Sequence, residues 1–202
     1  MLIICLGQIL IFIIKDLDEA SRSVVASRKD AMLRKRQIFY FTENEEEQPM
    51  VYPGRIVEAR VIAVAPKAVR LEVFGVECSV RARDMAWEWM PDATEKFQVG
   101  DLVLVCVNKI EMPDAESMTV AVDAKGATEN TNKDNLKKCH RQGKYSGIVV
   151  DVYKGTYFIR LDLGVNAIAH ECNMASLPGK RDKIGFVVTR INETSEVAEG
   201  II

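Results

Sequence analysis

One apolar hairpin pattern occurs three times along the chain, and this internal repeat limits the possible folds more than any other feature. Each copy begins with a strand-like apolar run, continues through a polar turn, and ends with a shorter apolar run. The first runs are residues 7–14, 100–107 and 183–188, and the polar turns are residues 18–21, 113–116 and 192–195. Repeated hairpins of this kind indicate small all-β domains.

A second repeat precedes the later two hairpins. Residues 54–61 match residues 143–150, and residues 69–73 match residues 159–163 in charge and hydrophobic pattern. A Gly-Val pair follows in each copy, at residues 75–76 and 164–165. Because glycines, charges and spacing all agree, the sequence predicts two related β modules, at residues 50–125 and 141–202.

Both modules are predicted to be small five-stranded barrels. Val69, Leu71 and Val73 alternate with Arg70 and Glu72, as a strand with one buried and one solvated face requires. Five short strands in about 70 residues favour a barrel over an open sheet. We expect strands near residues 54–64, 68–74, 77–81, 101–110 and 118–123, and near residues 143–153, 156–162, 166–170, 183–191 and 196–201. The predicted fold class is all-β, with tandem barrels.

The remaining segments predict a partial barrel and two linkers. Residues 1–41 contain only the closing hairpin of a barrel, followed by a basic helix at residues 27–36 that Ser27 caps. Residues 42–49 are acidic and end in proline, and residues 126–140 begin with a Gly/Thr/Asn-rich stretch. Both are expected to be linkers, and a short helical turn is expected at residues 92–97.

Composition excludes several functional classes. The chain is 48% hydrophobic, so most of it can fold around a core, and its 27 Lys and Arg against 29 Asp and Glu give a net charge of −2, which excludes coating nucleic acid by bulk charge. The 5 cysteines form no C-x-x-C pair and the 2 histidines lie near no nucleophile motif. We therefore expect no metal, no cofactor, no catalysis and a reducing, cytoplasmic location. The apolar run at residues 1–14 is too short to cross about 30 Å of hydrocarbon.

The C-terminal module resembles the S-one (S1) RNA-binding repeat, a family named after a small-subunit ribosomal protein. The resemblance rests on the glycine-aromatic strand at residues 155–161, the strand at residues 164–170 that ends in histidine, and the final hairpin. Residues 50–125 resemble a more diverged copy, and residues 6–29 resemble only the closing hairpin. The resemblance implies an oligonucleotide-binding (OB) fold that binds single-stranded RNA on its second and third strands, by base stacking and phosphate contacts.

For the C-terminal module, the resemblance places the stacking aromatic at Phe158 and the nucleic-acid-contacting histidine at His170. The strand alternation turns Phe158 and Arg160 outward, and Lys144 and Lys154 complete the predicted contacts. Each of the first three has a structural alternative. The strand of Phe158 can be buried on both faces, Arg160 can pair with a carboxylate, and His170 can bond to backbone.

The first module keeps cations but lacks the aromatic. Aligning the two modules replaces Phe158 with Ala68 and His170 with Arg81, while Arg70 keeps the position of the second-module arginine. Such a set contacts phosphates without selecting bases. The predicted contacts of this module are Arg55, Arg70 and Arg81.

Trp87 and Trp89 follow the third strand of the first module. We expect them to fill the end of that barrel, the alternative being that they stack on a base.

The turn of the closing hairpin differs between copies. In the family, a turn Asp and a following Arg contribute to the binding surface. The N-terminal hairpin retains both as Asp18 and Arg22, whereas the last hairpin has Asn192 and Glu196. A glutamate at that position would repel phosphate.

The leading hypothesis is therefore non-enzymatic binding of single-stranded RNA. One alternative is a protein-interaction or scaffolding protein, which the sequence pI of about 5.8 also fits. Another is binding of single-stranded DNA, because sequence does not reveal contacts to the 2′-hydroxyl. No membrane partner is expected. The apolar N-terminal hairpin, with its unpaired strand edges, predicts that another surface covers it. We expect either that the sequence begins inside a longer chain, or that the hairpin packs against the neighbouring barrel or against a second copy of the chain.

Overall fold

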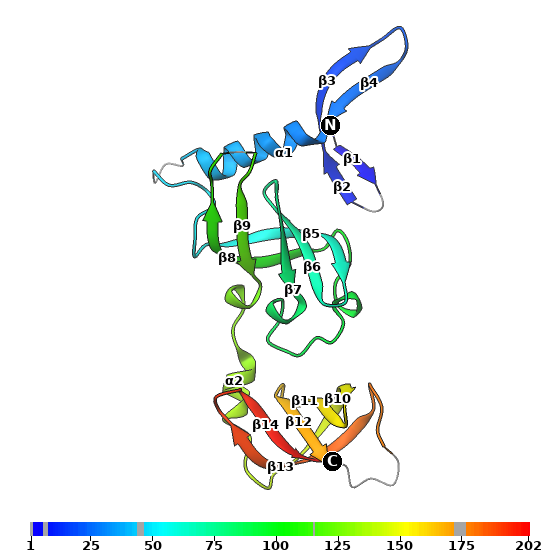
Figure 1. Cartoon of the computed structure of the whole chain (residues 1–202), viewed down its shortest axis with the longest axis vertical. Coiled ribbons are helices and arrows are strands. Elements are labelled where there is room, and N and C mark those ends of the chain that lie inside the picture. Colours follow the sequence, from blue (N-terminus) through cyan, green and yellow to red (C-terminus); the bar gives the residue numbers. More distant parts are fainter. Residues whose placement is uncertain (1, 6–7, 44–46, 115, 172–176) are drawn as a thin grey trace. The chain divides into compact units, whose positions relative to one another are not determined.

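The computed structural model describes residues 2–5, 8–43, 47–114, 116–171 and 177–202, which leaves residues 44–46 of the expected acidic linker outside the described part. The chain divides into two compact units (Figure 1). Unit 1 consists of Met1–Met85 and Asp92–Ala127, and unit 2 of Ala86–Pro91 and Thr128–Ile202. Among the described residues, no helix combines the length and apolarity needed to span a bilayer.

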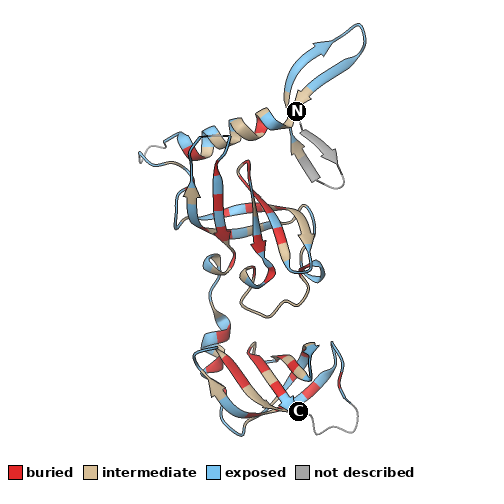
Figure 2. Ribbon diagram, viewed as in Figure 1, coloured by how far each residue is buried: buried red, intermediate tan, exposed pale blue. Residues whose placement is uncertain are grey.

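Unit 1 contains a nearly closed barrel. Its strands are β5 (Ile56–Ala65), β6 (Ala68–Val73), β7 (Val76–Arg81), β8 (Leu102–Glu111) and β9 (Thr119–Asp123), in the order β7-β6-β5-β8-β9. Buried and exposed residues alternate along them (Figure 2). Short 3-10 turns lie at Ala82–Asp84, Ala93–Glu95 and Lys125–Ala127, and the second of these falls within the predicted helical turn.

Unit 2 contains a closed barrel. Its strands are β10 (Lys144–Tyr153), β11 (Thr156–Leu161), β12 (Asn166–Glu171), β13 (Lys183–Asn192) and β14 (Val197–Ile201). β14 pairs antiparallel with β13 and parallel with β12, which closes the barrel. Tyr157, Ile159 and Leu161 point into the core beside Phe186. The predicted all-β fold with tandem barrels is confirmed, and every predicted strand end lies within two residues of the observed one.

A short helix, α2 (Thr131–Leu136), lies in the segment expected to be a linker. The side chain of Asn130 caps it by accepting the backbone N–H of Lys133.

The N-terminal segment forms two hairpins. Their strands are β1 (Leu2–Cys5), β2 (Gln8–Ile11), β3 (Ile13–Asp18) and β4 (Ser23–Ser27). The β3–β4 hairpin has the same type of turn as the closing hairpins of both barrels. In each, a side-chain oxygen accepts the backbone N–H of a serine three residues later, at 3.3 Å from Asp18, 2.7 Å from Asp114 and 3.2 Å from Asn192. Each hairpin also carries a register shift in its first strand. The repeated turn and register shift are thereby confirmed. The expectation that residues 7–14 form the first strand of the N-terminal hairpin is wrong, because Gln8–Ile11 pairs with β1 and only Ile13 and Ile14 of that run belong to β3.

The basic helix α1 (Arg28–Arg36) begins at the predicted cap, where Ser27 Oγ accepts the N–H of Asp30, and continues into a π-helical turn at Gln37–Phe41. The turn packs on the β6–β7 end of the barrel, with Phe39 stacked on Phe74 at 4.0 Å between ring centroids. Gly75 has a φ of +91° and lies so close to α1 that a Cβ there would be 2.6 Å from the Met32 carbonyl oxygen. The helix therefore forms part of unit 1.

Candidate nucleic-acid interface

The outer face of β10, β11 and β12 forms the candidate interface in unit 2, and the strand registers fix which side chains are neighbours on it. Three rows cross the strands. In the order β10, β11, β12 they are Ile148, Arg160 and Asn166, then Asp151, Phe158 and Ile168, then Tyr153, Thr156 and His170. The three residues predicted for this face lie in three adjacent rows of it.

Phe158 lies on the outside of the barrel. Its neighbours Tyr157 and Ile159 are only 6% and 0% exposed, whereas Phe158 is half-buried. Trp89 makes an edge contact with the Phe158 ring, at 5.2 Å between centroids and 80° between planes, and Phe158 is not among the residues that form the barrel core. The core is therefore complete without Phe158.

A hydrogen bond fixes the side chain of Arg160 beside Asn166, its partner on the neighbouring strand. Arg160 Nη1 donates to Asn166 Oδ1 at 3.0 Å. Burial lowers the pKa of Arg160, and the nearby Glu88 carboxylate opposes that effect. Because an arginine ordinarily titrates far above neutral pH, the guanidinium still supplies a positive charge to the face.

His170 is exposed in the third row, where its Nδ1 lies 3.2 Å from Thr156 Oγ1. Lys154 occupies the tight β10–β11 turn, with Nζ 5.3 Å from the centroid of the exposed Tyr153 ring. Lys144 is exposed at the start of β10, where it pairs with β13 instead of β11. It therefore lies beyond the three rows.

Trp87 and Trp89 are not part of a barrel core, and the expectation that they fill the end of the first barrel is wrong. Both are partly exposed in the Ala86–Pro91 segment, which belongs to unit 2. Trp87 Nε1 donates to the Thr128 carbonyl at 3.1 Å, and the Trp87 carbonyl accepts from Asn166 Nδ2 at 3.1 Å. The local sequence pattern did not reveal that this segment contacts Asn166, since the two lie about 80 positions apart.

Strand pairing also corrects the alignment of the two barrels. β5–β6 and β10–β11 are each joined by a two-residue turn, so equivalent positions are counted from that turn. Ala68 then corresponds to Thr156, and Arg70 corresponds to Phe158. The predicted match of Ala68 with Phe158 is wrong by two residues, because a slip of two preserves the alternation of a strand. The match of Arg81 with His170 agrees with the pairing.

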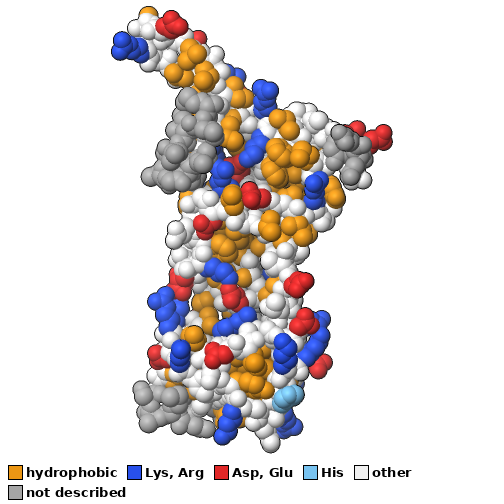
Figure 3. Space-filling view, turned by 180° about the vertical axis from the view of Figure 1, so that it is seen from behind, with side chains coloured by type: hydrophobic (Ala, Val, Ile, Leu, Met, Phe, Trp, Pro, Cys, Tyr) orange, Lys and Arg blue, Asp and Glu red, His pale blue; other side chains and the backbone are white. Residues whose placement is uncertain are grey.

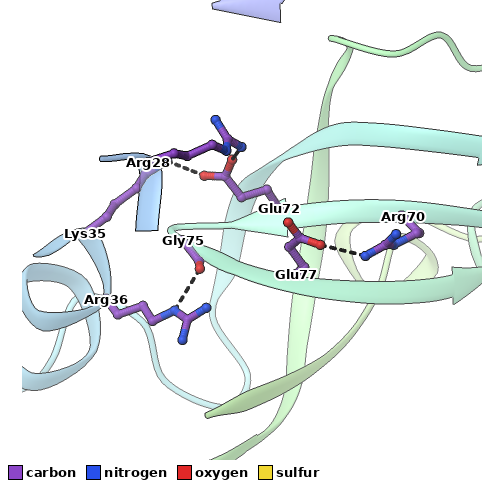
Figure 4. A network of polar contacts seen from close by, with 7 residues as sticks. All are labelled: Arg28, Lys35, Arg36, Arg70, Glu72, Gly75 and Glu77. Atoms are coloured by element: carbon purple, nitrogen blue, oxygen red, sulfur yellow. Dashed lines mark hydrogen bonds and ion pairs between the residues drawn. The ribbon is translucent and has the colours of Figure 1, made fainter. Parts of the chain in front are cut away.

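By the same count, Glu72 takes the position of Arg160, and it is buried although it points out of the barrel. Helix α1 covers it (Figure 4). Lys35 Nζ lies 2.8 Å from Glu72 Oε1, and Arg28 Nη2 lies 3.5 Å from Oε2. Arg36 Nε donates to the Gly75 carbonyl at 2.8 Å. Three basic side chains of α1 therefore bind acceptors within unit 1, namely the Glu72 carboxylate and the Gly75 carbonyl.

The arginines predicted for the first barrel have partners of their own. Arg70 pairs with Glu77 at 2.6 Å and Arg81 with Asp84 at 2.9 Å, both at exposed positions. Exposed ion pairs contribute only about 0–1 kcal/mol, so phosphate can compete for these guanidinium groups. The Arg55 guanidinium lies over a tyrosine ring, 5.5 Å from its centroid. On the surface drawn in Figure 3, Lys and Arg side chains are intermixed with Asp and Glu.

The remaining residues considered in the sequence analysis lie in the turns of two different hairpins. Arg22 is exposed in the β3–β4 turn of unit 1, with a φ of +50°. Glu196, in the β13–β14 turn of unit 2, accepts from Asn130 Nδ2 at 2.7 Å, and its carboxylate lies 3.9 Å from Lys133 Nζ. The nearby ammonium of Lys133 offsets part of the charge of Glu196, which reduces the repulsion predicted there.

Comparison with known proteins gives one sequence match. Residues 51–118, which form most of the first barrel, match the S1 RNA binding domain. The match falls on the module that the sequence analysis considered the more diverged. No curated protein matches the chain.

Three solved structures are similar at low identity. The first is the a/eIF2alpha–aDim2p–rRNA complex from Pyrococcus horikoshii OT3, at 15% identity and a TM-score of 0.34, over 44% of this chain and 56% of that one. The second is a multidomain protein with nucleic acid binding domains from Streptococcus pneumoniae TIGR4, at 12% identity and a TM-score of 0.27, over 99% of this chain and 67% of that one. The third is Drosophila Unr CSD456, at 15% identity and a TM-score of 0.24, over 75% of this chain and 61% of that one. The chain thus spans just over half the length of the first of these.

Proposed function

We propose that the chain binds single-stranded RNA in the cytoplasm, without catalysing a reaction on it, on the outer face of β10, β11 and β12. The observation that carries this proposal is the placement of Phe158, Arg160 and His170 in adjacent rows of one barrel face. Rows lie about 7 Å apart along a strand, and strands about 5 Å apart. A ring, a fixed cation and an imidazole are thus close enough to contact one short stretch of nucleotides. The match of the first barrel to the S1 RNA binding domain supports the same class of ligand.

Each group has a distinct role in this proposal. A base stacks on Phe158, which contributes about 1–3 kcal/mol and tolerates any base. Arg160 and Lys154 bind phosphates, so affinity falls as salt rises. His170 donates or accepts a hydrogen bond at a base edge or a 2′-hydroxyl.

The test is a titration of labelled, unstructured RNA and DNA oligonucleotides of about 12 nucleotides at several salt concentrations. We expect RNA to bind more tightly than DNA, with a slope of log affinity against log salt of about −0.7 per neutralised phosphate. Arg160→Met should reduce the slope by about that amount, whereas Arg190→Met, an exposed arginine of β13, should leave it unchanged. Equal affinity for DNA would favour the DNA-binding alternative, and no binding at low salt would favour a scaffolding protein.

We also propose that the N-terminal hairpin joins two copies of the chain. Ile14 and Val24 are 41% and 49% exposed. Residues at the same register in the other two hairpins are at most 6% exposed, namely Val107 and Val120 in β8–β9, and Val188 and Ala198 in β13–β14. In both barrels the other three strands of the sheet complete the core around this face. β3–β4 is a two-stranded sheet, so a second copy is proposed to cover it.

Analytical sedimentation of the protein at several concentrations tests this association. Val24→Lys should convert a dimer to a monomer, since it places a charge on the apolar face. Leu104→Lys, at a site on β8 that is 56% exposed, is the control and should leave the dimer intact. A wild-type chain that sediments as a monomer at every concentration would refute the proposal.

A further inference from the structure

Three consecutive residues, 87–89, lie beside the candidate interface, and Trp87 and Trp89 contact it directly. The Trp87 carbonyl accepts from Asn166 Nδ2 at 3.1 Å. The Glu88 carboxylate interacts electrostatically with Arg160. The Trp89 ring makes an edge contact with Phe158 at 5.2 Å. The segment thus engages a hydrogen-bond donor, a cation and an aromatic ring of the same face.

Each of these groups matches a part of a nucleotide. A carbonyl oxygen resembles the acceptors on base edges, a carboxylate carries the negative charge of a phosphate, and an indole is a flat aromatic ring comparable to a purine. The three groups come from adjacent residues, and the order of residues 87–89 along the chain matches the order of the rows that they face. Asn166 and Arg160 belong to the first row, and Phe158 to the second.

We propose that the segment 87–89 occupies the nucleotide-binding face of unit 2 in the free protein and that single-stranded nucleic acid must displace it to bind. This inference rests on the proposed function. The ring of Phe158 cannot receive a base on the side where Trp89 lies, and Arg160 cannot bind a phosphate at full strength beside Glu88. The segment therefore lowers the affinity of the face for nucleic acid.

The chain provides its own reporter, since its only two tryptophans are Trp87 and Trp89. In a Trp87→Phe background, Trp89 is the sole tryptophan. Titration with an unlabelled RNA oligonucleotide should then shift its emission to longer wavelength, as the ring leaves Phe158 for water. An emission that stays constant while RNA binds would overturn the inference.

Affinity provides the second test. Trp89→Ala should bind RNA about twofold to tenfold more tightly than the wild type, the range that one aromatic pair contributes. Glu88→Gln should also bind more tightly, most clearly at low salt. Trp87→Phe keeps the backbone carbonyl that Asn166 uses, so it is the matched control and should change affinity little.

The outcomes separate the inference from the proposed function. If the wild type binds and Trp89→Ala binds equally or more weakly, the segment does not compete, and only the inference fails. If neither chain binds RNA, the proposed function fails and the inference fails with it. If the tighter binding of Trp89→Ala disappears in Trp89→Ala/Phe158→Ala, both are supported, because the gain then depends on the ring that Trp89 covers.

Discussion

Replacing Phe158 with alanine separates a binding role from a core role. The ring is half-buried on the outer face, where it makes an aromatic contact with Trp89. Its loss removes an aromatic pair worth about 0.5–1.5 kcal/mol and opens no cavity in the barrel. We therefore expect unfolding free energy to fall by about 1 kcal/mol. Truncating Ile159, which is 0% exposed in the same strand, should cost about 2–5 kcal/mol.

The effect on binding follows from two opposing contributions. Phe158→Ala removes a base stack of about 2 kcal/mol, and it also removes the Trp89 contact of about 1 kcal/mol that the base must displace. The net loss is about 1 kcal/mol, or about fivefold in affinity. With Trp89 already replaced by alanine, the full 2 kcal/mol should appear, or about thirtyfold.

Two measurements check this prediction. Fluorescence anisotropy of a labelled RNA oligonucleotide gives affinity, and urea unfolding followed by circular dichroism gives stability. Phe41→Ala is the control, since it removes a phenylalanine that is 39% exposed in unit 1, and it should change neither RNA affinity nor the unfolding of unit 2. A stability loss of about 3–5 kcal/mol on Phe158→Ala would show that the ring is core and would refute the stacking role.

Three further substitutions test the packing, two of them with matched controls, and urea unfolding checks each. Glu72→Gln should destabilise unit 1 by about 1–3 kcal/mol, because it breaks a buried carboxylate away from two cations, whereas Glu77→Gln, in an exposed pair, should cost about 0–1 kcal/mol. Tyr40→Phe should cost about 1–2 kcal/mol, since the hydroxyl donates to a buried strand carbonyl at 2.8 Å. Gly200→Ala should cost about 1–3 kcal/mol, because its Cβ would lie 2.1 Å from a carbonyl oxygen, whereas Gly185→Ala meets nothing within 4 Å and should be neutral. Equal effects within any pair would contradict the packing described for it.

The sequence predicted most of the fold because strands and turns leave local signals. Alternation located each of the ten barrel strands, and the capped basic helix was found from Ser27 and the residues that follow it. Alternation has a period of two, however, so it could not detect that Arg70 and not Ala68 corresponds to Phe158. That alignment required the strand pairing.

The site was predicted less completely, since its details depend on contacts between distant residues. The outward direction of Phe158 and Arg160 followed from alternation alone. The partners did not, because Trp89 lies about 70 positions before Phe158 in the sequence. The burial of Glu72 had the same cause. An outward acidic residue predicts solvent exposure, and the helix that covers it is about 40 positions earlier.

The two barrels close differently, and this difference affects how each one opens. In unit 2 a parallel ladder between β12 and β14 completes the ring of strands. In unit 1, β7 and β9 are the two ends of the sheet and share no such ladder. Amide protons on the facing edges of β7 and β9 therefore lack ladder protection, and they should exchange with deuterated solvent faster than those joining β12 to β14. The seam of unit 1 is thus where local fluctuations of that barrel should begin.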